Sequence, residues 1–143
     1  MSNAVKRLYI TEAEVNEMLD MNLALEALDE VFKARSAGEV RNEPRHRLPV
    51  GNGSMNFMAA TWPEKGWAGH KSYVSGDFRV TLYGTNGEGL LALIGAGRMG
   101  QVRTGAASGI ATKYMARDDA SSVGIIGSGY QAQTQLEAVC AVR

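Results

Sequence analysis

The sequence predicts an α+β domain followed by the first strand and helix of a parallel α/β fold. Three observations support this fold class. Residues 22–37 place apolar side chains at helical spacing, and residues 55–94 contain short strand-like runs separated by glycine-containing breaks. Residues 123–142 read as an apolar strand, a glycine-rich turn and a helix, which is the order that opens a βαβ unit.

Two helices are expected near the N-terminus. Thr11 followed by Glu14 is a capping-box pattern, in which the hydroxyl accepts a hydrogen bond from the third helical amide and the glutamate reaches back to the cap. The second helix covers residues 22–37, and Gly38 stands where a left-handed C-terminal cap is usual. Residues 39–49 then turn basic, and we expect an extended arm that is able to meet an anion.

An antiparallel meander is expected in the middle of the chain. Its strands are predicted at residues 55–60, 67–75, 78–83 and 90–94. The last two flank the pair Asn86-Gly87, which favours positive φ in a hairpin connection. Residues 100–116 follow as a helix so rich in glycine and alanine that we expect it to pack closely against another element.

Composition excludes several classes of protein. The 143 residues hold 15 basic and 15 acidic side chains, so a nucleic-acid partner is not expected. The single Cys140 can form neither an internal disulfide nor a zinc site of the usual kind. No apolar run is long enough to span a membrane, and residues 1–10 lack the apolar core of a signal peptide. We therefore expect a cytoplasmic protein without a membrane partner.

Two glycine-rich loops match the dinucleotide fingerprint, residues 95–100 fully and residues 127–132 in the variant that ends in alanine. The glycines of this fingerprint let a pyrophosphate approach the backbone at a helix N-terminus. The second loop has the required context, because an apolar strand precedes it and a helix follows. The first follows the second strand of a hairpin, whose antiparallel pairing does not suit the fingerprint.

We therefore expect a dinucleotide at the second loop and only a close strand-to-helix turn at the first. Two alternatives remain open at this point. In the first, the second loop is merely a tight or anion-binding turn. In the other, the protein is a small Rossmann protein that uses the first loop.

Three stretches, residues 101–108, 111–117 and 123–133, resemble the ornithine cyclodeaminase/μ-crystallin family. The most specific part is Arg103-Thr104-Gly105-Ala106 with the second glycine-rich loop further along, and the likeness covers nearly the whole chain. The resemblance implies a substrate-binding and dimerising α+β domain over residues 1–117, and the start of a Rossmann domain for NAD or NADP over residues 118–143. It also implies a homodimer.

The chain departs from that family pattern at its end. Arg143 comes one strand and one helix into the implied Rossmann domain. The acidic residue that contacts the ribose, and the catalytic aspartate that the resemblance places in this domain, lie beyond it. We therefore expect an N-terminal fragment or a truncated gene product, with a truncated Rossmann domain and with little cofactor affinity or turnover by itself.

By the same resemblance, Arg45, Lys71 and Arg103 match substrate-binding residues. A guanidinium offers a fork of donors that holds a carboxylate, so two arginines suit the α-carboxylate of an amino or imino acid. Lys71 stands in an aromatic strand, where desolvation lowers a lysine pKa and favours a catalytic role in proton transfer. The alternatives are solvated charges for the arginines and a protective edge-strand lysine for Lys71.

The expected cofactor contacts comprise Thr104 and the second loop, namely Gly127, Ser128, Gly129, Tyr130 and Gln131. The alternative for Thr104 is a hydrogen bond to the backbone of its own helix. His70 lies next to Lys71 in a strand, so it faces the opposite side and is expected to be structural.

The resemblance implies a nicotinamide-dependent enzyme that acts on a small α-amino or α-imino acid by cyclodeamination, imine reduction or dehydrogenation. Asn56 stands near the place where ornithine-cyclising members carry an acidic residue for the distal amine, and a neutral amide pairs with an ammonium less strongly. This weakens the ornithine reading. The alternative is a non-enzymatic, μ-crystallin-like protein that binds a small ligand and NADPH.

Overall fold

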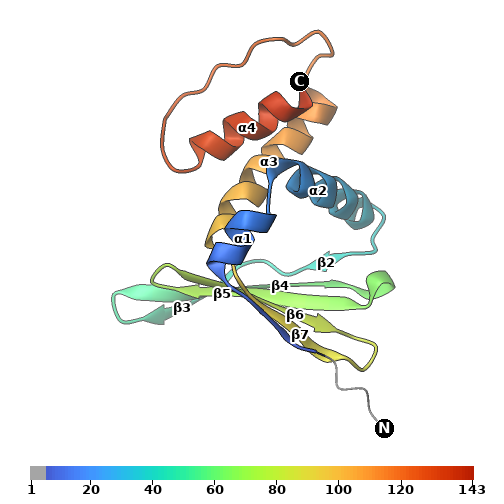
Figure 1. Cartoon of the computed structure of the whole chain (residues 1–143), viewed down its shortest axis with the longest axis vertical. Helices are drawn as coiled ribbons and strands as arrows, with labels where there is room; N and C mark the ends of the chain where they lie inside the picture. The colour runs from blue at the N-terminus through green and yellow to red at the C-terminus, as the bar shows by residue number, and fades with distance from the viewer. Residues whose placement is uncertain (1–5) are drawn as a thin grey trace.

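The structure is a computed structural model, which describes residues 6–143. Within these residues one mixed sheet forms a layer, and four α-helices are arranged above one face of it (Figure 1). The strand order across the sheet is β1-β7-β6-β5-β4-β2, with β3 also paired to β4. The main part of the chain therefore forms an α+β domain.

The strands are β1 (Leu8–Ile10), β2 (Arg41–Asn42), β3 (His46–Val50), β4 (Gly53–Trp62), β5 (Trp67–Val74), β6 (Asp77–Gly84) and β7 (Gly89–Gly95). The helices are α1 (Glu12–Met18), α2 (Met21–Ser36), α3 (Gly97–Met115) and α4 (Ala132–Val142), with a 3-10 turn, η1 (Pro63–Lys65), between β4 and β5.

Both N-terminal helices are confirmed, and so are the capping residues that predicted them. The Thr11 hydroxyl accepts from the Glu14 amide at 3.3 Å, while the Glu14 carboxylate accepts from the Thr11 amide at 2.7 Å. The second helix begins after Asp20, whose side chain accepts from the Leu23 amide, and Gly38 follows it at φ +83°. The sequence did not predict β1, because its three residues are too few to show a period.

The meander is confirmed from β4 to β7, with antiparallel pairing throughout. Gly87 takes the positive φ expected in the last hairpin, at +99°, whereas Asn86 does not. The basic arm at residues 39–49 is extended, and its two short strands β2 and β3 both pair with β4.

Helix α3 begins at Gly97, three residues before its expected start, so most of the first glycine-rich loop lies inside its first turn. Its small residues allow close packing against α4, as expected. A Cβ on Gly105 would overlap the Thr134 carbonyl oxygen, and one on Gly109 would lie 3.0 Å from that of Ala138. Glycine at these positions therefore offsets its low helix propensity by letting the two helices touch.

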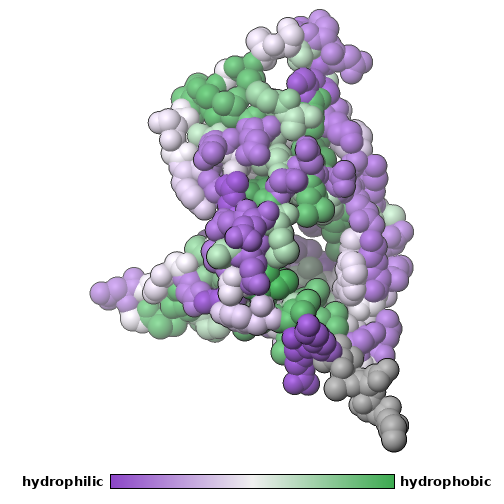
Figure 2. Space-filling model, viewed as in Figure 1, coloured by the Kyte–Doolittle hydropathy of each residue, from purple (hydrophilic) through white to green (hydrophobic). Residues whose placement is uncertain are grey.

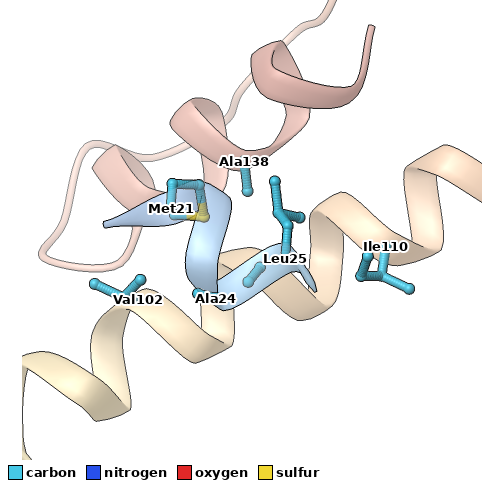
Figure 3. Packing of buried hydrophobic residues seen from close by; sticks show 7 residues of the cluster. Met21, Ala24, Leu25, Val102, Ile110 and Ala138 are labelled. Atoms are coloured by element: carbon cyan, nitrogen blue, oxygen red, sulfur yellow. The ribbon is translucent and has the colours of Figure 1, made fainter. Parts of the chain in front are cut away.

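The buried apolar cluster lies between helices α2, α3 and α4 (Figure 3). Its members are Met21, Ala24, Leu25, Val102, Ala106, Ile110 and Ala138. The last helix is thus fixed to the N-terminal part of the chain by an apolar core, and this fixes the position of the loop that precedes it.

The expected strand at residues 123–126 is wrong. Residues 117–131 contain neither helix nor strand, and the Ile126 side chain is fully exposed. A strand needs a hydrogen-bonded neighbour, and no strand within residues 6–143 lies beside this segment. The helix that follows is confirmed at Ala132–Val142.

Candidate functional site

Lys71 projects from β5 toward the first turn of α3. A Cβ placed on Gly100 would lie 2.9 Å from the Lys71 Nζ, so glycine at this position leaves room for the ammonium. The same Nζ lies 5.0 Å from the centre of the Phe78 ring, within cation–π range. The ammonium is therefore held between an aromatic ring and a helix start.

The structure brings the three predicted substrate-binding residues together. Burial lowers the pKa of Lys71, and the positive charges of Arg103 and then Arg45 lower it further. Glu12 acts in the opposite direction on the same pKa. Arg45 comes from the basic arm and Arg103 from α3, so the sheet, the arm and the helix all contribute to this cluster.

Within residues 6–143, Arg45, Lys71 and Arg103 form no ion pair with a carboxylate, whereas five other lysines and arginines do. The Glu12 carboxylate is the one negative charge that acts on Lys71. The positive charges of the three residues still repel one another, and this repulsion is relieved further when an anion binds. The cluster is therefore suited to a carboxylate ligand.

The first glycine-rich loop already holds an anionic group of the protein itself. The Glu12 carboxylate accepts hydrogen bonds from the backbone amides of Gly97, at 3.0 Å, and Arg98. A Cβ on Gly95 would lie 2.7 Å from the Glu12 amide nitrogen, and one on Gly97 would lie 3.1 Å from the Glu12 carboxylate. These glycines allow close approach of α1, and its carboxylate takes the place that a pyrophosphate would need.

The second glycine-rich loop is open. Gly127 takes φ +100°, and no atom lies within 4 Å of a Cβ built on Gly127 or Gly129. No side chain within residues 6–143 caps the first turn of α4. The loop is tied to α3 because the Gln101 side-chain amide donates to the Tyr130 carbonyl oxygen.

Gln101 and Glu12 are functional candidates that the sequence analysis missed. Gln101 is buried, and its backbone carbonyl also accepts from the Thr134 hydroxyl, so it joins the start of α3 to the start of α4. Glu12 lies 85 positions from Gly97 in the sequence, and no local pattern reports a contact at that separation.

A cavity of about 730 Å³ separates the two glycine-rich loops. Its lining includes Glu12, Phe78, Gln101 and Tyr130. Phe78 also lies beneath the Lys71 ammonium, so the cavity adjoins the cationic cluster. In the space-filling view the molecule is hollowed on the side where the β3–β4 hairpin projects from beneath the helices (Figure 2).

Thr104 and His70 lie close to Arg45, Lys71 and Arg103 in the sequence or the fold, but their contacts are with other groups. The Thr104 hydroxyl donates to the Gly100 carbonyl oxygen at 2.7 Å, within its own helix. His70 stacks on Phe57, with ring centres 5.0 Å apart, and on Tyr83 on the face of the sheet opposite Lys71. The position of His70 agrees with the structural role expected for it.

Asn56 is buried on the same face of the sheet as Lys71, since Met58 pairs with Lys71 and Asn56 lies two residues before Met58. Its side-chain amide donates to Ser54, and its carbonyl oxygen accepts from Arg47 Nε at 3.3 Å. Sequence analysis did not single out Arg47 as a site residue.

Other site classes find no support in the part of the chain that the structure describes. No group of three or more histidine, cysteine or acidic side chains there is arranged to hold a metal ion. None of its helices combines the length and the apolar character needed to cross a membrane.

The fold and the site together define an α+β domain in which Arg45, Lys71 and Arg103 gather near the start of α3 and form no ion pair within residues 6–143. The chain belongs to the ornithine cyclodeaminase/mu-crystallin family, whose pattern it matches over residues 5–143. This finding confirms the resemblance drawn from the sequence.

The relatives of this sequence include amino-acid dehydrogenases, imine reductases and cyclodeaminases. An alanine dehydrogenase of Archaeoglobus fulgidus is 32% identical over 146 residues, which cover 94% of this chain and 45% of that enzyme. An archaeal alanine dehydrogenase dimer with bound NAD has a TM-score of 0.86 at 32% identity, over 96% of this chain and 46% of that one.

A second solved structure is the Thermococcus litoralis Delta(1)-pyrroline-2-carboxylate reductase in complex with NADH and L-proline. It has a TM-score of 0.82 at 30% identity, over 95% of this chain and 46% of that one. The chain thus spans a little under half the length of these relatives.

Proposed function

We propose that this chain forms the substrate-binding part of a nicotinamide-dependent enzyme acting on an α-amino or α-imino acid. The observation that carries the proposal is the convergence of Arg45, Lys71 and Arg103 without a carboxylate partner within residues 6–143. Names of relatives support the same class, since they include amino-acid dehydrogenases and imine reductases.

Arg45 and Arg103 are proposed to hold the α-carboxylate of the substrate. A guanidinium presents planar, paired donors that match the two oxygens of a carboxylate. The two arginines come from different elements, the basic arm and α3, so a bound carboxylate would bridge them. Such a bridge would fix the orientation of the substrate Cα relative to the sheet.

Lys71 is proposed to bind and move a proton at the substrate nitrogen or carbonyl group. Its lowered pKa increases the fraction of neutral amine at a given pH, and a group must exchange its proton readily to act as an acid or base. The contact with Gly100 fixes where the Nζ lies, because a larger residue at that position would displace it.

Two features of the second loop support a dinucleotide there, while the strand that the fingerprint requires before the loop is not formed within residues 6–143. The positions of Gly127 and Gly129 are open to close approach, and the amides that begin α4 lack a side-chain cap, so an anion has donors available there. Gly127, Ser128, Gly129, Tyr130 and Gln131 would line the pyrophosphate. The bound cofactor would supply hydride transfer at the substrate Cα. Thr104, whose hydroxyl bonds its own helix, is proposed only as a neighbour of this site.

The test is hydride transfer, followed by nicotinamide absorbance, on the protein that carries this sequence with any continuation encoded after residue 143. The substrates are a panel of α-amino acids and cyclic imino acids. We expect turnover with at least one of them, and a loss of about 100-fold or more in kcat/KM for Lys71→Met. Binding of ligand and NADPH without turnover would instead identify a non-enzymatic binding protein.

A homodimer is proposed through the face of the sheet that points away from Lys71. Phe57, His70 and Tyr83 stack across that face, and Phe57 and Tyr83 are exposed. Exposed apolar patches of this kind mark interaction sites. Sedimentation equilibrium should give twice the chain mass, and Phe57→Asp should shift the protein toward the monomer.

A further inference from the structure

A single buried glutamine connects the two glycine-rich loops. Gln101 is only 4% exposed, and its side-chain oxygen accepts from Arg98 Nη1 at 2.8 Å. Its side-chain nitrogen donates to the Tyr130 carbonyl oxygen. A guanidinium only donates and a carbonyl oxygen only accepts, so these two partners fix which end of the amide points to which loop. Gln101 therefore bridges the loops in one defined orientation.

The contact with Gln101 also fixes the orientation of a peptide group in the second loop. The Tyr130 carbonyl and the Gln131 N–H belong to one trans peptide unit, so they point in opposite directions. Because the carbonyl is directed at Gln101, the Gln131 N–H points away from α3. It donates to no acceptor within residues 6–143, and Gln131 is exposed. This amide is therefore available to a ligand on the open side of the loop.

A second buried side chain holds the neighbouring peptide group. Thr134 is fully buried, and its hydroxyl lies 3.3 Å from the Gln101 carbonyl oxygen and 3.2 Å from the Gln131 carbonyl oxygen. The Ala132 amide donates to the Gly129 carbonyl oxygen at 2.9 Å, so that donor is already used. The peptide groups on both sides of Gln131 are thus held in place by protein groups.

We propose that Gln101 is a positioning residue for the cofactor, because it directs the Gln131 amide outward to donate to the pyrophosphate of a nicotinamide dinucleotide. The inference rests on the proposed function, in which residues 127–131 line the pyrophosphate. A hydrogen bond to a charged phosphate oxygen is stronger than one to a neutral acceptor. Gln101 itself does not touch the cofactor, and acts through the peptide group between Tyr130 and Gln131.

The test measures NADH affinity by fluorescence titration on the protein that carries this sequence, with any continuation after residue 143. Gln101→Met keeps the length of the side chain and removes both of its hydrogen bonds, so NADH affinity should fall about ten-fold. Gln101→Glu should lower the affinity further, because a carboxylate still accepts from Arg98 but repels the Tyr130 carbonyl oxygen. In both variants the KM for the amino or imino acid should stay within about two-fold of the parent value.

Gln135→Met is the matched control. The Gln135 side-chain nitrogen also joins α4 to α3, since it donates to the Thr104 carbonyl oxygen at 3.4 Å, but its side chain forms no hydrogen bond with residues 127–131. This variant should bind NADH within about two-fold of the parent, even where its unfolding temperature falls as much as that of Gln101→Met. A general loss of contact between the two helices would instead weaken NADH binding equally in both variants and would overturn the inference.

Unchanged NADH affinity in folded Gln101→Met, or equal losses of affinity for NADH and for the amino acid, would also overturn the inference while leaving the proposed function in place. Circular dichroism checks the fold. If Gln101→Met does not fold, Gln101→Asn carries the same prediction, because it keeps a buried amide that is one carbon too short to reach Tyr130. If the parent binds no NADH, the proposed cofactor site fails and the inference fails with it.

Discussion

The two glycine-rich loops have nearly the same sequence pattern, but protein atoms pack against the first and leave the second open. At residues 95–100 the Glu12 carboxylate accepts hydrogen bonds from the first amides of α3, and α1 approaches within contact distance of Gly95. At residues 127–132 the glycines are open, and the start of α4 has no side-chain cap within the described chain. One helix start is therefore closed by the protein, and the other is free for a ligand.

A glycine-rich fingerprint therefore indicates backbone freedom and does not indicate which group uses it. Glycine permits close approach, and what approaches is decided by the rest of the fold. At the first loop, the group that approaches the glycines is helix α1 of the same chain. This contact positions α3, and with it Gly100 and Arg103, beside Lys71. The first loop thus lies beside the proposed substrate site, and the second is the one proposed for the cofactor.

The largest expected effect concerns cofactor affinity at the second loop. Gly129→Val should weaken NAD(P)H binding to the protein that carries this sequence, with any continuation after residue 143, by about 100-fold or more, because the second glycine lets a pyrophosphate reach the backbone. Stability should not change, since a Cβ at Gly129 meets no atom within 4 Å. Fluorescence titration measures the affinity, and unchanged binding would remove the loop from the cofactor site.

Stability should respond at the first loop instead. Gly95→Ala places a methyl group 2.7 Å from the Glu12 backbone nitrogen, so α1 must shift. Overpacking of this kind costs about 1–3 kcal/mol in the free energy of unfolding. Urea denaturation of Gly95→Ala and of its counterpart Gly129→Ala checks this, and equal stability of the two variants would contradict the closed-loop description.

A smaller loss is expected for Glu12→Gln. The carboxylate acts as an N-terminal cap for α3, and replacing such a cap costs about 1–2 kcal/mol. The amide side chain keeps one acceptor, so the substitution is milder than removal of the side chain. Thermal unfolding measures the change; a variant as stable as the parent would show that Glu12 contributes little to the start of α3.

The smallest effect is a difference in pH dependence between the two sites. Lys71 has a pKa below 10.5, so its charge is fully present at low pH and is lost as the pH rises through that lowered value. Carboxylate binding beside the first loop should weaken a few-fold over this range, while cofactor binding at the second loop stays constant. In Lys71→Arg the decline should move to higher pH. Calorimetric titration of the carboxylate and of the cofactor at a series of pH values checks this. The same pH dependence for both ligands would contradict the assignment of two separate sites.

Much of the fold could be predicted because its signals are local. The Thr11–Glu14 capping box and the Asn86-Gly87 hairpin each depend on residues a few positions apart, and both are confirmed. The strand expected at residues 123–126 fails for the opposite reason. Its apolar residues express a preference that only a hydrogen-bonded neighbour can realise, and the described chain gives them none.

The residues of the candidate site also divide into those that could be predicted from the sequence and those that could not. The resemblance picked out Arg45, Lys71 and Arg103, and the structure places them together. The contacts of Glu12, Gln101 and Arg47 were not predictable, because each depends on elements that only the folded chain brings side by side.

The contrast between the two loops can be checked by a crystal structure of the protein that carries this sequence, with any continuation after residue 143 and with NAD bound. We expect the diphosphate against the backbone of residues 127–131, with the Glu12 carboxylate still on the amides of Gly97 and Arg98. A diphosphate seated on residues 95–100, with Glu12 displaced, would contradict it.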